Sequence, residues 1–446
     1  MARLSTATPP LEYRRATDNP WWIPPFLGGV PASLAPENLR LLGVLTFALF
    51  FENYDFSVLG NALPQLAAAF GISKAAQGDF LSFVRMGALP AFLLFPWADR
   101  IGRRQLLLVS VIGMSLGSAL TATSQSAVQF ALFQIATRTF LVTAGVLAVV
   151  IITEEFPAEH RGWGIGMLGG VSAIGFGFGA MTYAAVNHLP FGWRSLYLVG
   201  VAPLALFPWV RRGVVETRRF ERARVAQARR ERPASVLRNS LEPILELWRT
   251  QPRRALAIGL LGMFSAAGTA VAFQFVSEFL QTERGWTPSG YGLMSILFGA
   301  LGIVGNPAAG RLADRFGRRA VAIATLLFFP LCAAAFYLGP AATVALPWTA
   351  MVFLSMANGV IARALAAELF PTAMRGTGGG TQALLETVGV LAVLFAYSRA
   401  MAWVDRQDLV LTALSCATVV AAVGVWLVPE TARRELEEIS EEEVPK

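Results

Sequence analysis

Three ionisable residues stand inside long apolar stretches of the sequence, namely Asp55, Arg85 and Arg138. Charged side chains are costly inside a membrane, so their presence there indicates function. On α-helices that rise about 1.5 Å per residue, all three would lie roughly 21 to 24 Å from the same end of their helices. One layer of the molecule is therefore expected to hold a carboxylate and two guanidinium groups, a set that suits reversible binding of an anion and a proton.

Asp55 is the candidate proton carrier, and Arg138 is the candidate ligand of an anion. A low-dielectric cleft favours the neutral form of a carboxylate, whereas a nearby guanidinium favours the ionised form. An anion that competes for the planar fork of Arg138 would therefore let Asp55 take up a proton. Two alternatives stay open: a permanent salt bridge of Asp55 with Arg85 or Arg138, and Glu52, one turn earlier, as the carrier. Arg85 would either line the same pocket or snorkel outward.

Other polar residues at similar depth are weaker candidates. Asn53, Tyr54 and Gln274 are expected to contact the substrate. Glu386 would contact the substrate, accept a second proton or bond a neighbouring helix. With two cysteines and two histidines, we expect neither a disulfide framework nor a metal site, and no cofactor.

The composition indicates a membrane protein rather than a soluble enzyme. Of 446 residues, 55% are hydrophobic and 15% are charged, against about 25% charged in soluble domains. No P-loop, H-E-x-x-H or G-x-S-x-G motif occurs, so ATP-driven and hydrolytic chemistry lack their parts. Apolar segments long enough to cross a bilayer predict twelve helices, because strands would leave backbone groups unpaired in lipid. These segments are 41–63, 78–98, 105–123, 127–151, 163–186, 194–211, 255–280, 289–310, 319–338, 343–366, 377–399 and 408–428.

The basic residues predict which side each loop occupies. Arginines concentrate in the N-terminal segment and in every second loop, above all in residues 211–254, which hold 13 of them. By the positive-inside rule both termini are cytoplasmic, in the inner membrane of the cell. We expect residues 1–40 to be a flexible tail, 212–254 a linker with an amphipathic interfacial helix, and 429–446 a second tail. The basic linker is expected to contact anionic lipid and not nucleic acid.

The two halves of the chain resemble each other in sequence. Three matches at nearly one offset predict two six-helix halves in parallel, residues 41–211 and 255–428. Carboxylates and arginines at the helix ends of each half would form charge networks. The matching pairs of segments, at offsets of 215, 214 and 214 residues, are 99–104 with 314–319, 154–162 with 368–376, and 216–219 with 430–433.

These motifs resemble the major facilitator superfamily over about residues 41–438. Gly310 to Arg319 matches its signature G-x-x-x-D-R-x-G-R-R in full, whereas Phe95 stands where the first copy would have glycine. The resemblance implies an all-α fold of twelve transmembrane helices, a monomer, and a cytoplasmic gate rather than a substrate site at the motifs; a simple topological anchor is the alternative. The gate residues so implied are Asp99, Arg100, Gly102, Arg103, Arg104, Glu154, Arg161, Gly310, Asp314, Arg315, Gly317, Arg318, Arg319, Glu368, Arg375 and Glu430.

The resemblance is to the metabolite:proton symporter and sugar-porter branches, which implies transport by alternating access. We expect import of a small organic anion, such as an aromatic or other carboxylate, together with a proton. The alternatives are a porter of sugars or neutral metabolites and a proton-coupled exporter of drugs or metabolites. Two departures weigh against them: helix 5 lacks the Gly-Pro of the antiporters, and only Gln274 stands where sugar porters carry paired glutamines.

Overall fold

The computed structural model describes residues 13–27, 29–214, 216–217, 244–302, 305–370 and 374–431. Within these residues the regular structure is helical, apart from one isolated bridge between Tyr13 and Pro31. The predicted linker helix and C-terminal tail lie largely outside them. The main helices are α1 (Pro36–Asn61), α2 (Leu63–Phe70), α3 (Lys74–Arg85), α4 (Ala88–Ile101), α5 (Arg103–Ala122), α6 (Ala127–Glu155), α7 (Arg161–Ser172), α8 (Ile174–Ala184), α9 (Trp193–Val199), α10 (Ala202–Ala205), α11 (Phe207–Gly213), α14 (Pro252–Gln274), α15 (Val276–Thr282), α16 (Pro288–Gly302), α17 (Gly305–Phe316), α18 (Arg318–Leu338), α19 (Ala345–Glu368), α20 (Arg375–Val404), α21 (Gln407–Ser415) and α22 (Ala417–Trp426).

Each of the twelve predicted segments falls on one helix or on consecutive helices, which confirms the all-α membrane fold. In the described part of the chain, nine helices are long and apolar enough to cross a membrane. A tenth span is the bent pair of 193–205 and 207–213, whose axes meet at 46°. The second predicted segment is interrupted, since α3 and α4 flank Met86–Gly87.

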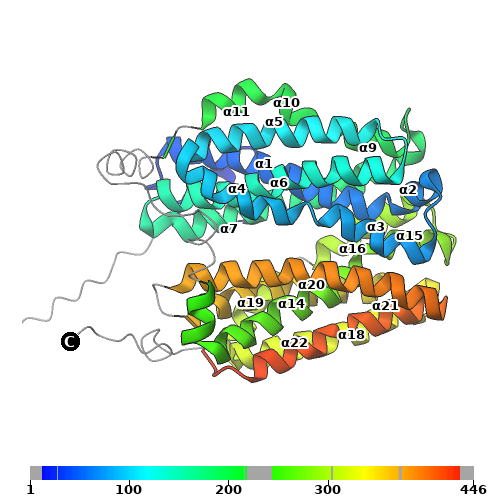
Figure 1. Ribbon diagram of the computed structural model, residues 1–446. Helices are drawn as coiled ribbons and strands as arrows, with labels where there is room; N and C mark the ends of the chain where they lie inside the picture. The colour runs from blue at the N-terminus through cyan, green and yellow to red at the C-terminus, as the bar shows by residue number, and fades with distance from the viewer. Residues whose placement is uncertain are drawn as a thin grey trace, which may run out of the picture.

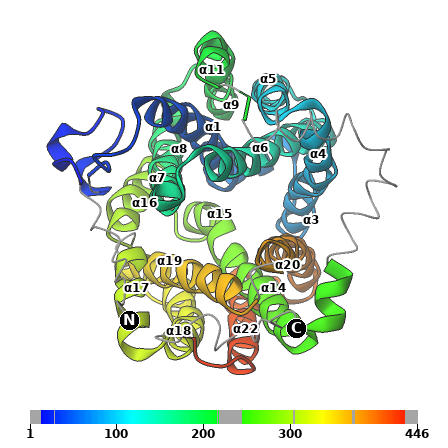
Figure 2. The ribbon, with the colours of Figure 1, turned by 90° about the vertical axis from the view of Figure 1, so that its left-hand side faces the viewer.

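The helices form two bundles that lie side by side (Figure 1). One bundle contains α1 to α11 and the other contains α14 to α22, and Figure 2 shows the same division along the helices. We call the end where α1 and α14 begin the motif end, because residues 99–104 and 314–319 lie there, and the opposite end the far end. Towards the far end α3 packs on α20 and α8 packs on α16.

Neutral hydrogen bonds join the halves at the far end. Tyr291 donates to Asn61 Oδ1 at 2.7 Å, and Ser277 donates to the Asn61 carbonyl at 2.6 Å. Gln281 donates to the Tyr183 hydroxyl at 2.6 Å. We call this group, with Gln65, the far-end seal; the set is Asn61, Gln65, Tyr183, Ser277, Gln281 and Tyr291.

Ion pairs at more exposed positions surround the far-end seal. Arg399 of α20 pairs with Asp79 of α3 at 2.6 Å. Lys74 at the start of α3 pairs with Glu283, which follows α15. The two halves are therefore joined at this end by a mainly neutral interior, with one buried carboxylate, Glu278, that accepts from Gln77 at 3.5 Å, and by a charged rim.

The repeated motif builds the same turn twice at the motif end. Gly102 and Gly317 have φ angles of 100° and 97°, in a region that residues with a Cβ avoid. The turn starts α5 and α18, whose first amides have no partner within the helix. Glu216 Oε1 accepts the amides of Arg103 and Arg104 at 3.0 and 3.3 Å. Glu430 accepts the equivalent amides in the second half at 2.8 and 3.1 Å.

The predicted N-terminal tail includes residues 13–27 and 29–35, which pack against the helices of the first half. Ile23, Val30 and Leu34 are buried to within 2% exposure, because they pack against the first half. The indole of Trp163 donates to the Gly29 carbonyl at 3.2 Å. Isolated apolar residues among prolines carry no periodicity, so the sequence pattern did not indicate this packing.

Candidate functional site

Asp55 of α1 and Arg138 of α6 form a buried ion pair in the first half. Arg138 Nη2 lies 3.1 Å from Asp55 Oδ2, and the two side chains are 9% and 6% exposed. Gln134, one turn before Arg138, donates to the other carboxylate oxygen at 3.2 Å. Removing one partner of such a pair costs about 3–5 kcal/mol, because the other charge is left buried alone. The pair is therefore a strongly coupled unit that responds to any competing charge.

Arg85 lies beside this pair and reaches the second half. It is 8% exposed, and it donates to the side-chain carbonyl of Gln274 at the end of α14. It does not snorkel outward: its guanidinium carbon lies 4.2 Å from the centre of the Phe56 ring. Arg138 approaches the same ring at 5.8 Å. Phe56 is 39% exposed, so the ring that both cations approach is only partly covered by protein.

Close helix contacts set the position of Arg138. Gly87 separates α3 from α4, and a Cβ atom there would lie 2.9 Å from the Arg138 Cβ. Thr139 of α6 donates to the Gly87 carbonyl at 2.9 Å. The break in the second predicted span thus lets α3 and α4 approach α6 and brings Arg85 and Arg138 to one layer.

The remaining residues predicted for the first half lie around this layer. Glu52 is half-buried; a side chain at Gly145 of α6 would overlap its carboxylate, and it interacts electrostatically with Arg138. Asn53 is half-buried and faces Gly175 of α8.

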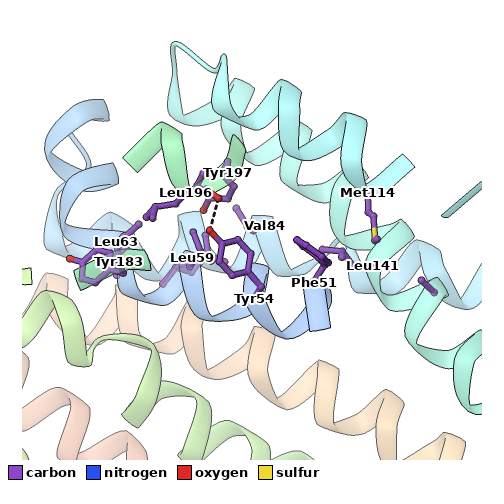
Figure 3. Close-up of a cluster of buried hydrophobic side chains, with 14 of the residues drawn as sticks. Phe51, Tyr54, Leu59, Leu63, Val84, Met114, Leu141, Tyr183, Leu196 and Tyr197 are labelled. Atoms are coloured by element: carbon purple, nitrogen blue, oxygen red, sulfur yellow. Dashed lines mark hydrogen bonds between the residues drawn. The ribbon is translucent and has the colours of Figure 1, made fainter. Parts of the chain in front are cut away.

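Tyr54 points into the core of the first half. Its hydroxyl donates to the Leu196 carbonyl of α9 at 2.7 Å, as Figure 3 shows. The ring is 2% exposed and packs against Phe178 at 5.6 Å. The structure therefore does not bring this hydroxyl to Arg138.

Glu386 lies in the second half, apart from Asp55. It is half-buried on α20, and Gln382, one turn earlier, donates to it at 2.8 Å. A Cβ atom at Gly262 of α14 would lie 3.5 Å from the Glu386 side chain. Among the three roles predicted for Glu386, this geometry places it against a neighbouring helix.

The motif residues form ion pairs within each half. Arg103 of α5 pairs with Glu154 of α6 at 3.3 Å, and Arg318 of α18 pairs with Glu368 of α19. Arg161 donates to the Phe156 carbonyl at 3.1 Å. Each pair joins two helices of one bundle rather than one bundle to the other. The side chains of Asp99, Arg100, Asp314 and Arg375, and residue Gly310, lie outside the description.

Phe56 and Gln134 are the site residues that the sequence analysis missed. Phe56 is one of 31 phenylalanines and carries no distinguishing pattern. Gln134 had a usable signal, since it precedes Arg138 by four residues and so shares its helix face. Among the described residues, no group of three or more His, Cys, Asp or Glu side chains is placed to hold a metal ion.

Comparison with known proteins places the chain among transporters. The model of the Major Facilitator Superfamily matches residues 45–394. The gallate transporter of Pseudomonas putida is 33% identical over 192 residues, which cover 42% of each protein. The cis,cis-muconate transport protein of Acinetobacter baylyi is 24% identical over 75% of this chain and 80% of its own. A crystal structure of a D-xylose-proton symporter has a TM-score of 0.71 and 19% identity, covering 88% of this chain and 98% of its own.

Proposed function

Because the chain belongs to the Major Facilitator Superfamily, and is thus a membrane transporter and not an enzyme, we propose that it imports a small organic carboxylate together with a proton. The observation that carries this proposal is the buried pair of Asp55 and Arg138, with a second guanidinium, Arg85, beside it. Gallate and muconate, after which two relatives are named, are both carboxylates. The site offers such an anion two cations and one titratable acid.

Coupling follows from competition for Arg138. A substrate carboxylate that binds Arg138 and Arg85 takes over the ion pair that Arg138 makes with Asp55. Asp55, left buried without its cation, then binds a proton, because an isolated buried charge is more costly than a neutral acid. The exposed face of Phe56 supports an aromatic ring next to the carboxylate. Substrate and proton therefore bind together and leave together.

We assign the motif end to the cytoplasm. The support is the excess of arginines at this end, which contains Arg103, Arg211, Arg253 and Arg318. In the conformation described, the far-end seal then closes the side from which substrate enters. The protein would work in the inner membrane as a monomer, with the two bundles rocking about the central layer.

The test is uptake into proteoliposomes with an imposed proton gradient. The panel holds gallate, benzoate, muconate, D-xylose and a cationic amphiphile. Asp55→Asn is the diagnostic variant, and Asp408→Asn at the far end is the matched control, since Asp408 pairs with the exposed Arg406. We expect the wild type and the control to concentrate a carboxylate when the lumen is alkaline.

The Asp55→Asn variant separates binding from coupling. It should still exchange labelled for unlabelled carboxylate, since Arg138 remains, but lose accumulation driven by the pH gradient. Accumulation by Asp55→Asn at the wild-type level would remove Asp55 from the proton pathway. Transport of D-xylose or the amphiphile without any carboxylate would refute carboxylate import. It would favour the porter of sugars or neutral metabolites, or the exporter.

A further inference from the structure

A cationic cavity lies at the motif end of the first half, outside the central layer. Its volume is about 740 Å³, and α5, α11 and the segment after α11 line it. Three arginines, Arg104, Arg211 and Arg212, face it, together with Phe207 and Pro208. The transport mechanism above uses none of these side chains.

The carboxylate in the wall offsets only part of the positive charge of the cavity, since one glutamate faces three arginines. Glu216 accepts three backbone amides, those of Arg103, Arg104 and Thr217, at 3.0, 3.3 and 3.1 Å. These bonds fix the carboxylate at the start of α5, and the cavity keeps an excess of positive charge. Arg104 is held in place because it donates to the carbonyls of Val214 and Arg211 at 2.8 and 3.2 Å.

Arg211 and Arg212 are the free cations of the cavity. Both are exposed, and within the described part of the chain no ion pair or side-chain hydrogen bond engages either guanidinium. Guanidinium groups bind the oxygens of phosphates in bidentate fashion. The cavity therefore offers a phosphate two guanidinium groups, those of Arg211 and Arg212, and the fixed positive charge of Arg104.

The second half serves as an internal comparison. Its equivalent turn has the same cap, since Glu430 replaces Glu216 and Arg319 replaces Arg104. At an offset of 214 residues, however, Arg211 and Arg212 become Val425 and Trp426. The Trp426 ring lies 5.8 Å from the Arg319 guanidinium carbon. The cap is common to both halves, whereas the arginine pair occurs at this position in the first half and not in the second.

We propose that this cavity binds the phosphodiester headgroup of an anionic phospholipid. The shared chemistry is that of any phosphate, but the setting favours a lipid. Trp209, one turn before Arg212, is 48% exposed, and Leu206, just before α11, is 45% exposed. Exposed tryptophan beside arginine at a helix end is typical of the membrane–water interface, where headgroup phosphates lie. Phe207 and Pro208 give the acyl glycerol an apolar wall.

The experiment compares lipid adducts on the purified full-length protein by native mass spectrometry. The protein is titrated with phosphatidylglycerol, phosphatidylcholine or inorganic phosphate. The diagnostic variant is Arg211→Gln/Arg212→Gln. The matched control is Arg249→Gln/Arg253→Gln, which removes two exposed arginines from the motif end of the second half. Thermal shift with the same three additives gives a second readout.

We expect the wild type and the control to retain phosphatidylglycerol in preference to phosphatidylcholine. The diagnostic variant should lose affinity for phosphatidylglycerol by at least about tenfold, since each arginine near a lipid surface contributes about 1 kcal/mol. Equal retention by the two double variants would overturn the proposal, as would equal binding of the two lipids. If inorganic phosphate raised the unfolding temperature and phosphatidylglycerol did not, the lipid proposal would be wrong. The cavity would then bind a soluble phosphate.

Discussion

Replacing Arg138 alone should destabilise the protein more than replacing Arg138 and Asp55 together. In Arg138→Gln the buried Asp55 loses its cation and must either keep an unpaired charge or bind a proton, at a cost of up to about 3–5 kcal/mol. The double variant Asp55→Asn/Arg138→Gln leaves two neutral amides that can bond each other. Because the two side chains are 6% and 9% exposed and 3.1 Å apart, their interaction energy should lie near the top of the usual range of about 0.5–3 kcal/mol.

Asp55→Asn should be the milder single variant. Arg138 then keeps Glu52 as a nearby carboxylate, one turn away on α1. The order of stability is therefore wild type, double variant or Asp55→Asn, and last Arg138→Gln. The measurement is the apparent unfolding temperature in one detergent, followed by intrinsic tryptophan fluorescence.

The same set of two single variants and one double variant, made on an exposed ion pair, gives a reference value for the interaction energy. Arg406 and Asp408 lie 2.7 Å apart, but the arginine is 61% exposed. Their interaction should be worth about 0.2–1 kcal/mol, as for other surface pairs. If the effects of the Asp55 and Arg138 substitutions simply add, or match those of the exposed pair, the buried pair described here does not exist in the protein.

Two further changes test the far end and the motif end. Gly78→Val should abolish uptake, because a Cβ atom at Gly78 would lie 2.9 Å from Tyr397 and overlap the α20 backbone. The control is Gly177→Val, where nothing lies within 4 Å. Full uptake by Gly78→Val would contradict the packing of α3 on α20. Glu216→Gln and Glu430→Gln should each cost about 0.5–2 kcal/mol of stability through loss of a helix cap. The measurement is the unfolding temperature, which the two variants should lower by similar amounts. A decrease in only one variant would argue against equivalent caps.

Most of the fold was predictable from the sequence because lipid restricts the choice of structure. Apolar segments of sufficient length must be helices, and their positions agree with the twelve predicted segments. The interruption between α3 and α4 was not predictable, because the sequence does not show that α6 packs against Gly87. The short helix α2 was missed because it follows α1 almost without interruption.

The sequence predicted how far along their helices the site residues lie, but not which of them contact one another. Residue counts along helices put Asp55, Arg85 and Arg138 in one layer, which the structure shows. Which arginine pairs with Asp55 depends on how each helix is rotated, and a helix that is apolar all round gives no period from which to read rotation. The cross-half bond of Arg85 to Gln274 also needs the packing of two bundles, which single-helix patterns do not contain.

The chemistry of the far-end seal determines how it opens. Its interior consists of hydroxyls and amides, such as Tyr183, Asn61 and Gln281, whose hydrogen bonds water can replace one for one. One charge is nevertheless buried beside the seal: the Glu278 carboxylate is 1% exposed and accepts from Gln77 of the first half at 3.5 Å. The charged pairs stand only at the more exposed rim, where dissolved salt screens them. Opening this end would thus exchange most protein hydrogen bonds for bonds to water, with dissolved salt weakening the rim pairs, while Glu278 would have to give up its contact with Gln77.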